Sequence, residues 1–348
     1  MRVFFYLISA YAHPTLAVKS FLLLHKIACA DYRLRAPQQC FGAILELKHA
    51  PMKSFTANAS LRSSTHRFQA LLATSLCLAL GACQDLTAQA TRTASQAGLA
   101  ASVLPGTRYR HQVFMSSPLT GTPLFVFIDG DGSPWRHGGT YVARDPTPDR
   151  PLALELAART PGSVIYLGRP CYFSTRNDPA CAPPVWTSGR YSTEVVESIA
   201  AVINRYATEN HSRCVVLVGY SGGGALSVLT APLVPSACAV VTIAADLDVD
   251  AWTDWHHYLP LKGSLNPATQ APLDSHIAQW HLVGDRDSNV PAQLSRRYLE
   301  RVPDDHIWHF SGFDHTCCWV EQWPDILARI DSELVVPAAG AAPVSHPD

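Results

Sequence analysis

Residues 214–224 read CVVLVGYSGGG, an apolar run followed at once by a glycine-rich turn. The β-branched residues of 214–218 predict a strand covered on both faces, and the pattern over 225–231 is helical. The turn therefore has the G-x-S-x-G spacing of a nucleophile elbow in its required setting between a strand and a helix. Glycine is needed two residues either side of the serine because the strained backbone leaves no room for side chains. Ser221 is the predicted nucleophile.

Apolar runs and helical patterns alternate on both sides of this turn. Strands are predicted at 124–128, 163–167, 214–218, 239–243, 277–283 and 306–310. Helices are predicted at 152–159, 193–208, 225–231, 292–301 and 319–334. Such alternation is typical of an α/β domain with a mostly parallel sheet and helices on both faces. We expect one catalytic domain over residues 105–336.

A serine nucleophile needs a base, and the base needs a carboxylate to orient it. Two polar segments follow predicted strands downstream of Ser221: GDRDSNVP at 284–291 and SGFDH at 311–315. Open α/β sheets place catalytic groups at the carboxyl ends of their strands. His315 is the best-placed base, because His306 and His309 lie within a predicted strand.

The elbow, the G-D-x-D-x-x-V-P segment and the G-x-D-H segment resemble the α/β-hydrolase superfamily over nearly all of residues 120–330. The resemblance implies an α/β-hydrolase fold and a triad of Ser221, Asp287 and His315. The family's acid commonly stands three residues after the glycine and three before Val-Pro. The resemblance also implies an oxyanion hole made by the backbone N–H groups of Gly222 and Asp131.

The position of the acid has an alternative. Some members of the superfamily carry it after the preceding strand, where this chain has Asp246, Asp248 and Asp250. These three residues also match the start of a calcium-binding loop. An EF-hand is excluded because Ala251 and His257 occupy its glycine and glutamate positions. Asp131 raises a separate question, since a carboxylate beside an oxyanion is unfavourable unless its side chain turns away.

Residues 67–83 read RFQALLATSLCLALGAC, an apolar run preceded by basic residues and ending in small ones. These are the regions of a secretory signal, and the run is too short to span a bilayer. Its end resembles the bacterial lipobox, in which the cysteine is lipidated. We therefore expect a signal peptide over 52–82, a lipid on Cys83 and a flexible tether over 83–104.

The remaining terminal segments are interpreted from the same pattern. Residues 1–51 precede a complete export signal and read as a misannotated extension. Residues 337–348 have the composition of a disordered tail. Gln84 follows the predicted lipidated cysteine and favours the periplasmic side of the outer membrane over the inner membrane.

Ten cysteines suit an oxidising compartment. Cys171 and Cys181 flank a loop that a disulfide between them would close. Cys214 and Cys238 can pair if their predicted strands are neighbours. The adjacent Cys317 and Cys318 are expected to stay reduced, because a disulfide between neighbouring residues is strained.

Together these features predict an envelope-tethered serine hydrolase that cleaves carboxylic esters, with no cofactor and no metal. Aromatic residues in 171–192 and 252–258 favour an ester with an apolar portion as the substrate. A formal charge of −1 gives no electrostatic reason to expect nucleic acid as a partner. Two alternatives remain: a serine peptidase or amidase on the same triad, and a non-catalytic binding lipoprotein of the envelope.

Overall fold

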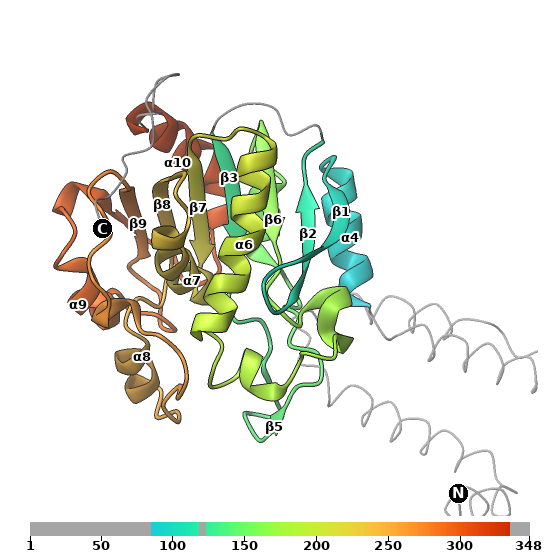
Figure 1. The fold of residues 1–348 in the computed structure, drawn as a ribbon. Helices are drawn as coiled ribbons and strands as arrows, with labels where there is room; N and C mark the ends of the chain where they lie inside the picture. Colours follow the sequence, from blue (N-terminus) through green and yellow to red (C-terminus); the bar gives the residue numbers. More distant parts are fainter. Residues whose placement is uncertain (1–84, 118–122, 335–348) are drawn as a thin grey trace, which may run out of the picture. The chain divides into compact units, whose positions relative to one another are not determined.

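A computed structural model describes residues 85–117 and 123–334; the predicted signal peptide, Cys83 and the tail 337–348 lie outside these ranges. Eight strands form one sheet in the order β1-β2-β6-β3-β7-β8-β9-β10 (Figure 1). The strands are β1 (Ala100–Pro105), β2 (Arg110–Met115), β3 (Leu124–Ile128), β6 (Ser163–Leu167), β7 (Val215–Tyr220), β8 (Ala237–Ile243), β9 (Ala278–Gly284) and β10 (Ile307–Phe310). All neighbours pair in parallel except β1 with β2 and β2 with β6. The predicted α/β fold class is confirmed.

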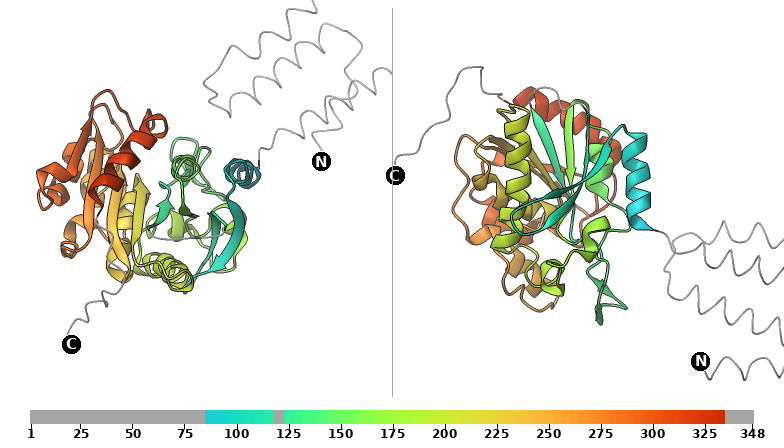
Figure 2. Two further views of the ribbon diagram at one scale, coloured as in Figure 1. Left: turned by 90° about the horizontal axis from the view of Figure 1, so that it is seen from above. Right: turned by 45° about the vertical axis from the view of Figure 1, so that its right-hand side comes forward.

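Helices cover both faces of this sheet (Figure 2). They are α4 (Leu86–Gln96), α5 (Leu152–Ala157), α6 (Thr193–Glu209), α7 (Gly222–Thr230), α8 (Val249–Trp255), α9 (Arg296–Leu299) and α10 (Trp319–Glu333). Helices α4 and α10 both contact α5, whereas α6 contacts α7. Within the described ranges, no helix has the length and apolarity of a membrane span.

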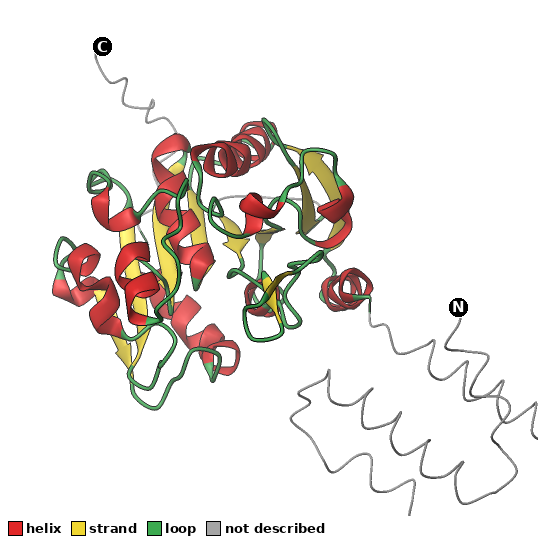
Figure 3. Ribbon diagram, turned by 90° about the horizontal axis from the view of Figure 1, so that it is seen from below, coloured by secondary structure: helices red, strands yellow, loops and turns green. Residues whose placement is uncertain are grey.

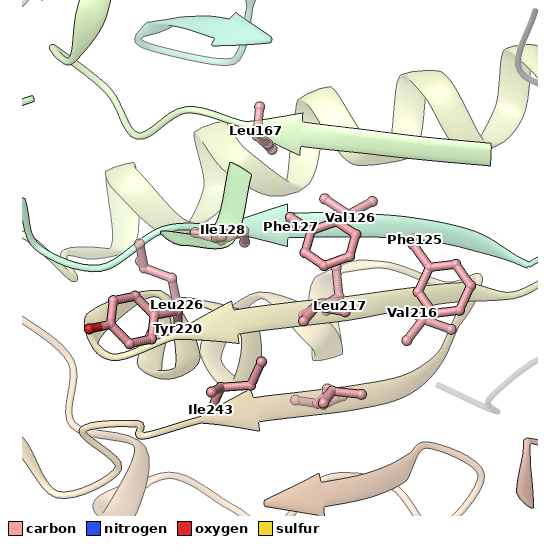
Figure 4. Packing of buried hydrophobic residues seen from close by; sticks show 14 of the residues in the cluster. Phe125, Val126, Phe127, Ile128, Leu167, Val216, Leu217, Tyr220, Leu226 and Ile243 are labelled. Atoms are coloured by element: carbon pink, nitrogen blue, oxygen red, sulfur yellow. The ribbon is translucent and has the colours of Figure 1, made fainter. Parts of the chain in front are cut away.

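The central strands form the core because both of their faces are covered. Every residue of β3, β6 and β7 is buried. Figure 4 shows the side chains of 125–128 beside those of Val216 and Leu217 from the adjacent strand. This explains why these strands read as unbroken apolar runs rather than as alternating patterns. A rigid core places the end of β7, and with it Ser221, at a fixed position.

The predicted flexible tether is wrong for the part that the structure describes. Residues from Asp85 onward form α4 and β1, and β1 pairs with β2 along its whole length. The Asp85 carboxylate caps the helix by accepting the Thr87 N–H at 3.0 Å. Ala90 and Ala94 are buried against the domain. Small residues that resemble a linker by composition here allow the helix to pack closely, so the residues from Asp85 onward belong to the domain.

Ala94→Asp should lower the free energy of unfolding by about 3 kcal/mol or more, because it places an unpaired carboxylate at a fully buried position. The neighbouring Ser95 is exposed on the same helix, so Ser95→Asp is the matched control and should change stability by less than about 1 kcal/mol. Chemical denaturation of both variants measures the difference. Equal stabilities would contradict the docking of α4.

Three disulfides join the described cysteines: Cys171–Cys181, Cys214–Cys238 and Cys317–Cys318. The first two pairings are those expected from the sequence, and the second joins neighbouring β7 and β8 at their starts. The expectation that Cys317 and Cys318 stay reduced is wrong. Cys318 adopts a left-handed backbone (φ 93°) in the turn before α10, and this turn brings the two sulfur atoms together.

Candidate active site

Ser221 stands at a sharp turn between β7 and α7. Its backbone is left-handed, with φ 53° and ψ −124°, which is uncommon for a residue with a side chain and costs about 1–3 kcal/mol. The Ser221 N–H donates to the Ile243 carbonyl of the adjacent strand at 2.9 Å. Anchoring to β8 holds the turn in this conformation.

The glycines of the elbow are required by close contacts. A Cβ on Gly219 would overlap the backbone of Gly223. A Cβ on Gly223 would overlap carbonyl oxygens at the end of β3, and one on Gly222 would overlap the Asp131 carboxylate. The two glycines of the G-x-S-x-G pattern and the additional Gly222 therefore each have a different close neighbour.

The structure brings Ser221, His315 and Asp287 together. His315 Nε2 lies 3.1 Å from Ser221 Oγ, and His315 Nδ1 lies 2.8 Å from Asp287 Oδ2. The other Asp287 oxygen accepts the backbone N–H groups of Asn289 and Val290, both at 2.8 Å. The Asp287 side chain is 1% exposed and that of His315 is 19% exposed. The arrangement joins a hydroxyl, an imidazole and a buried carboxylate in sequence, as general-base activation of a nucleophile requires.

Tyr220 supports the histidine from the neighbouring position. Its hydroxyl donates to the His315 backbone carbonyl at 3.0 Å, and the two ring centroids lie 5.2 Å apart. Sequence reasoning did not identify this contact, because Tyr220 occupies the unspecified position of G-x-S-x-G. The contact ties the loop that carries His315 to the elbow that carries Ser221.

The rival acids, all among the described residues, do not bond to His315. Asp248 and Asp250 both accept the Asn266 side-chain amide, at 2.8 and 2.9 Å, and Asp248 also caps α8. Asp246 is buried and neither of its side-chain oxygens has a partner among the described residues. Burial raises the pKa of Asp246 well above its usual value, with a further contribution from the Asp131 charge. In the described part of the chain, the His315 ring bonds to Asp287 and to none of these three.

Asp131 lies beside Gly222 in the loop that follows β3. The Asp131 carboxylate accepts hydrogen bonds from Arg169 at 2.6 Å, from Arg190, and from the Tyr191 hydroxyl at 2.8 Å. Its backbone carbonyl accepts the Tyr172 hydroxyl at 2.7 Å. The Asp131 carboxylate therefore lies close to the elbow, and its charge is neutralised there by two arginines.

The charges around Asp131 strongly shift the pKa of its carboxyl group. Burial alone would raise the pKa of Asp131, but the guanidinium groups of Arg190 and Arg169 outweigh it and hold the pKa well below its usual value. The two arginine side chains are only 2% and 5% exposed. Neither the Asp131 nor the Gly222 N–H has a protein acceptor in the described ranges.

Aromatic residues expected to line the substrate pocket prove to be buried. Tyr172, Phe173, Trp186 and Tyr191 of the loop 171–192 are each less than 7% exposed. Tyr172 and Tyr191 hold Asp131 through their hydroxyls rather than facing a ligand.

Asp131→Asn should lower the free energy of unfolding by about 3–5 kcal/mol at neutral pH, because it leaves two buried guanidinium groups without a counter-charge. The folded-state pKa of this aspartate lies below its unfolded value. The stabilisation is therefore complete above about pH 4 and is lost as the pH falls further. Wild-type stability should fall on acidification more steeply than that of the variant. Denaturation at several pH values measures the stability of the wild type and of the variant. An equal dependence of stability on pH in the two proteins would contradict the pairing of Asp131 with the two arginines.

The similarities of this chain to known proteins are found among solved structures. No family model and no characterised protein sequence matches the chain. Solved structures with a similar fold include a lidless α/β serine hydrolase from Xanthomonas campestris (14% identity, TM-score 0.44, 69% of this chain and 96% of that one). A bacterial membrane phospholipase A (15%, 0.47, 77% and 98%) and a Pyrococcus furiosus esterase (12%, 0.47, 69% and 93%) are also similar. At these identities the likeness concerns the fold.

Proposed function

We propose that this chain is a serine hydrolase that cleaves carboxylic esters. The observation that carries the proposal is the unbroken series of contacts from Ser221 Oγ through the His315 ring to the buried Asp287 carboxylate. A serine on a strained elbow, with a base at 3.1 Å and an oriented carboxylate behind it, has the arrangement of an activated nucleophile.

The proposed reaction has two steps. Ser221 Oγ attacks the ester carbonyl while His315 Nε2 takes its proton, and Asp287 stabilises the resulting imidazolium. The N–H groups of Gly222 and Asp131 bind the oxyanion at the amino end of α7. His315 returns its proton to the leaving alcohol, which leaves an acyl group on Ser221. Water, deprotonated by His315, then releases the carboxylic acid and restores the serine.

The electrostatics of the site favour an uncharged acyl group. Asp131 is the ionised side chain nearest to Gly222, and it is already paired with two arginines. The charge nearest to this oxyanion donor is therefore already neutralised, which supports an ester with apolar substituents near Gly222.

Labelling by a fluorophosphonate tests the enzyme proposal. Wild-type protein should react covalently, and Ser221→Ala should not. A panel of chromogenic esters of increasing acyl length, run beside the matching anilides, then separates esterase from amidase. An unlabelled wild-type protein would overturn the proposal in favour of a binding protein, and faster cleavage of anilides would favour a peptidase or amidase.

We further propose that the protein is exported and anchored by a lipid on Cys83, on the periplasmic side of the outer membrane. The signal-like residues 67–83 support this, as do disulfides typical of an oxidising compartment. Incorporation of a labelled fatty acid should disappear in Cys83→Ala. Label that persists in this variant would contradict the anchor, and separation of the two membranes by density tests the sorting.

A further inference from the structure

Exposed apolar side chains gather on two loops of the domain. One is the β4–β5 hairpin, formed by β4 (Trp135–Arg136) and β5 (Tyr141–Val142); the other is the α8 loop, residues 255–259. Six of the seven large exposed apolar residues in the described ranges lie there: Trp135, Tyr141, Val142, Trp255, Tyr258 and Leu259. The seventh, Leu233, ends the short turn after α7. Leu259 is 86% exposed, which is an unfavourable position for a leucine in water.

Both loops belong to the edge of the sheet that carries Ser221. The hairpin follows β3 and the α8 loop follows β8, and β7 with its serine lies between these two strands. His256 Nε2 lies 2.7 Å from the carbonyl of Asn289, two residues beyond Asp287, which fixes the α8 loop beside the active site. Figure 1 shows β5 and α8 at this lower edge, and Figure 3 views the same edge from below.

The chemistry of the two loops fits a lipid surface. Tryptophan and tyrosine favour the boundary between water and hydrocarbon because each has an apolar ring with a polar group. The hairpin segment 135–144 contains Arg136 and Arg144, which favour anionic headgroups. Asp145, which follows it, is paired with Arg176 at 3.6 Å, and Asp254 precedes the α8 loop. A protein partner would be expected to cover one contiguous patch. Here two separate tips follow the strands on either side of β7, at the same edge of the sheet.

The entry of the chain into the domain lies at the same edge. Arg176 Nη1 donates to Thr87 Oγ1, in the first turn of α4, at 3.5 Å. Arg176 belongs to the turn that follows the carboxyl end of β6. Cys83 precedes Asp85 by two residues in the sequence, and two residues reach at most about 7 Å. A lipid on Cys83 would therefore enter the membrane close to this edge.

We propose that the β4–β5 hairpin and the α8 loop form a membrane-binding surface that holds the active-site edge against a lipid bilayer. The substrates of this site are then esters of amphiphiles that reach Ser221 from the bilayer, rather than esters dissolved in water. This inference extends the proposed esterase function. The substrate class that it names rests on that proposed function.

The test uses the full chain carrying Cys83→Ala, so that binding does not depend on a lipid anchor. Vesicles of phosphatidylethanolamine and phosphatidylglycerol are the probe. The triple variant Trp135→Ser, Tyr141→Ser, Leu259→Ser should bind them at least about tenfold more weakly. It should hydrolyse a soluble short-chain ester at the wild-type rate but cleave a vesicle-embedded ester more slowly. Leu233→Ser, also an exposed apolar residue, is the matched control and should bind as the parent does.

A second measurement reports on the loops themselves. Vesicles with brominated acyl chains should quench tryptophan fluorescence in the parent, and less so in Trp135→Phe and Trp255→Phe. Unchanged quenching in both variants, or equal loss of binding in Leu233→Ser, would overturn the proposal. So would a dimer of the parent chain that the triple variant dissociates, because the surface would then bind a second copy.

The inference and the proposed function fail in distinguishable ways. Ser221→Ala should bind vesicles as the parent does while losing hydrolysis. A protein that cleaves soluble esters but ignores vesicles would overturn the membrane-binding surface alone. A protein that binds vesicles through these loops but cleaves no ester would overturn the proposed function and leave the surface in place.

Discussion

Ser221→Ala is expected to lower kcat for ester hydrolysis by at least about 10⁴-fold. The hydroxyl is the only group of the site that can form the acyl intermediate, so His315 and Asp287 have nothing to activate in its absence. The remaining rate would come from the oxyanion donors and from binding of the substrate. Initial rates on a chromogenic ester, with KM measured separately, check the result.

The stability of this variant is the control. Alanine at 221 retains the Cβ and the left-handed backbone (φ 53°), so the fold should persist with little change in thermal midpoint. A folded, inactive protein supports the proposed role. A folded protein that retains a tenth or more of the wild-type rate would remove Ser221 as the nucleophile.

Asp287→Asn should lower kcat by roughly 10³–10⁴-fold. The amide oxygen would take over the backbone N–H groups of Asn289 and Val290, which leaves the NH2 group facing His315 Nδ1. A donor at that position forces the histidine proton onto Nε2, where it faces Ser221. The ring then cannot accept the serine proton, and the pH dependence of the residual rate should change accordingly.

Asp246→Asn is the matched comparison, because it makes the same chemical change in the strongest rival acid. Burial raises the pKa of Asp246 well above its usual value. Asparagine matches aspartate in shape, and neither oxygen of the Asp246 side chain hydrogen-bonds to His315 or to another described residue, so the rate should stay near that of the wild type. A large loss in Asp246→Asn with little loss in Asp287→Asn would transfer the role to the earlier strand.

Local patterns were sufficient to predict the central strands. The strands 124–128 and 163–167 have the predicted bounds, because they are buried on both faces and appear as unbroken apolar runs. His315 was found because it follows a predicted strand end, whereas Asp287 was selected by the resemblance to α/β-hydrolases, with three earlier aspartates left as alternatives. Helix α4 was missed because its alanines and threonines resemble a linker, and only packing against the domain reveals it.

The surroundings of Asp131 could not have been predicted in the same way. Arg169, Arg190 and Tyr191 lie 38, 59 and 60 residues away along the chain and belong to no periodic pattern. Their meeting depends on the order of strands in the sheet and on the path of the loop 171–192. An acid beside an oxyanion site is expected to be unfavourable from the sequence alone. The tertiary structure removes this difficulty because it brings two arginines to the Asp131 carboxylate.

The close approaches at the elbow have a consequence for redesign. Gly219, Gly222 and Gly223 each meet a different part of the molecule: the next helix, the Asp131 carboxylate and the end of β3. An added methyl group at any one of them would displace a separate element, so this short segment offers an engineer almost no freedom. The solvent-exposed tips of the hairpin and the α8 loop are not constrained in this way. Substrate preference can therefore be altered by substitutions in these two loops while the catalytic residues stay unchanged.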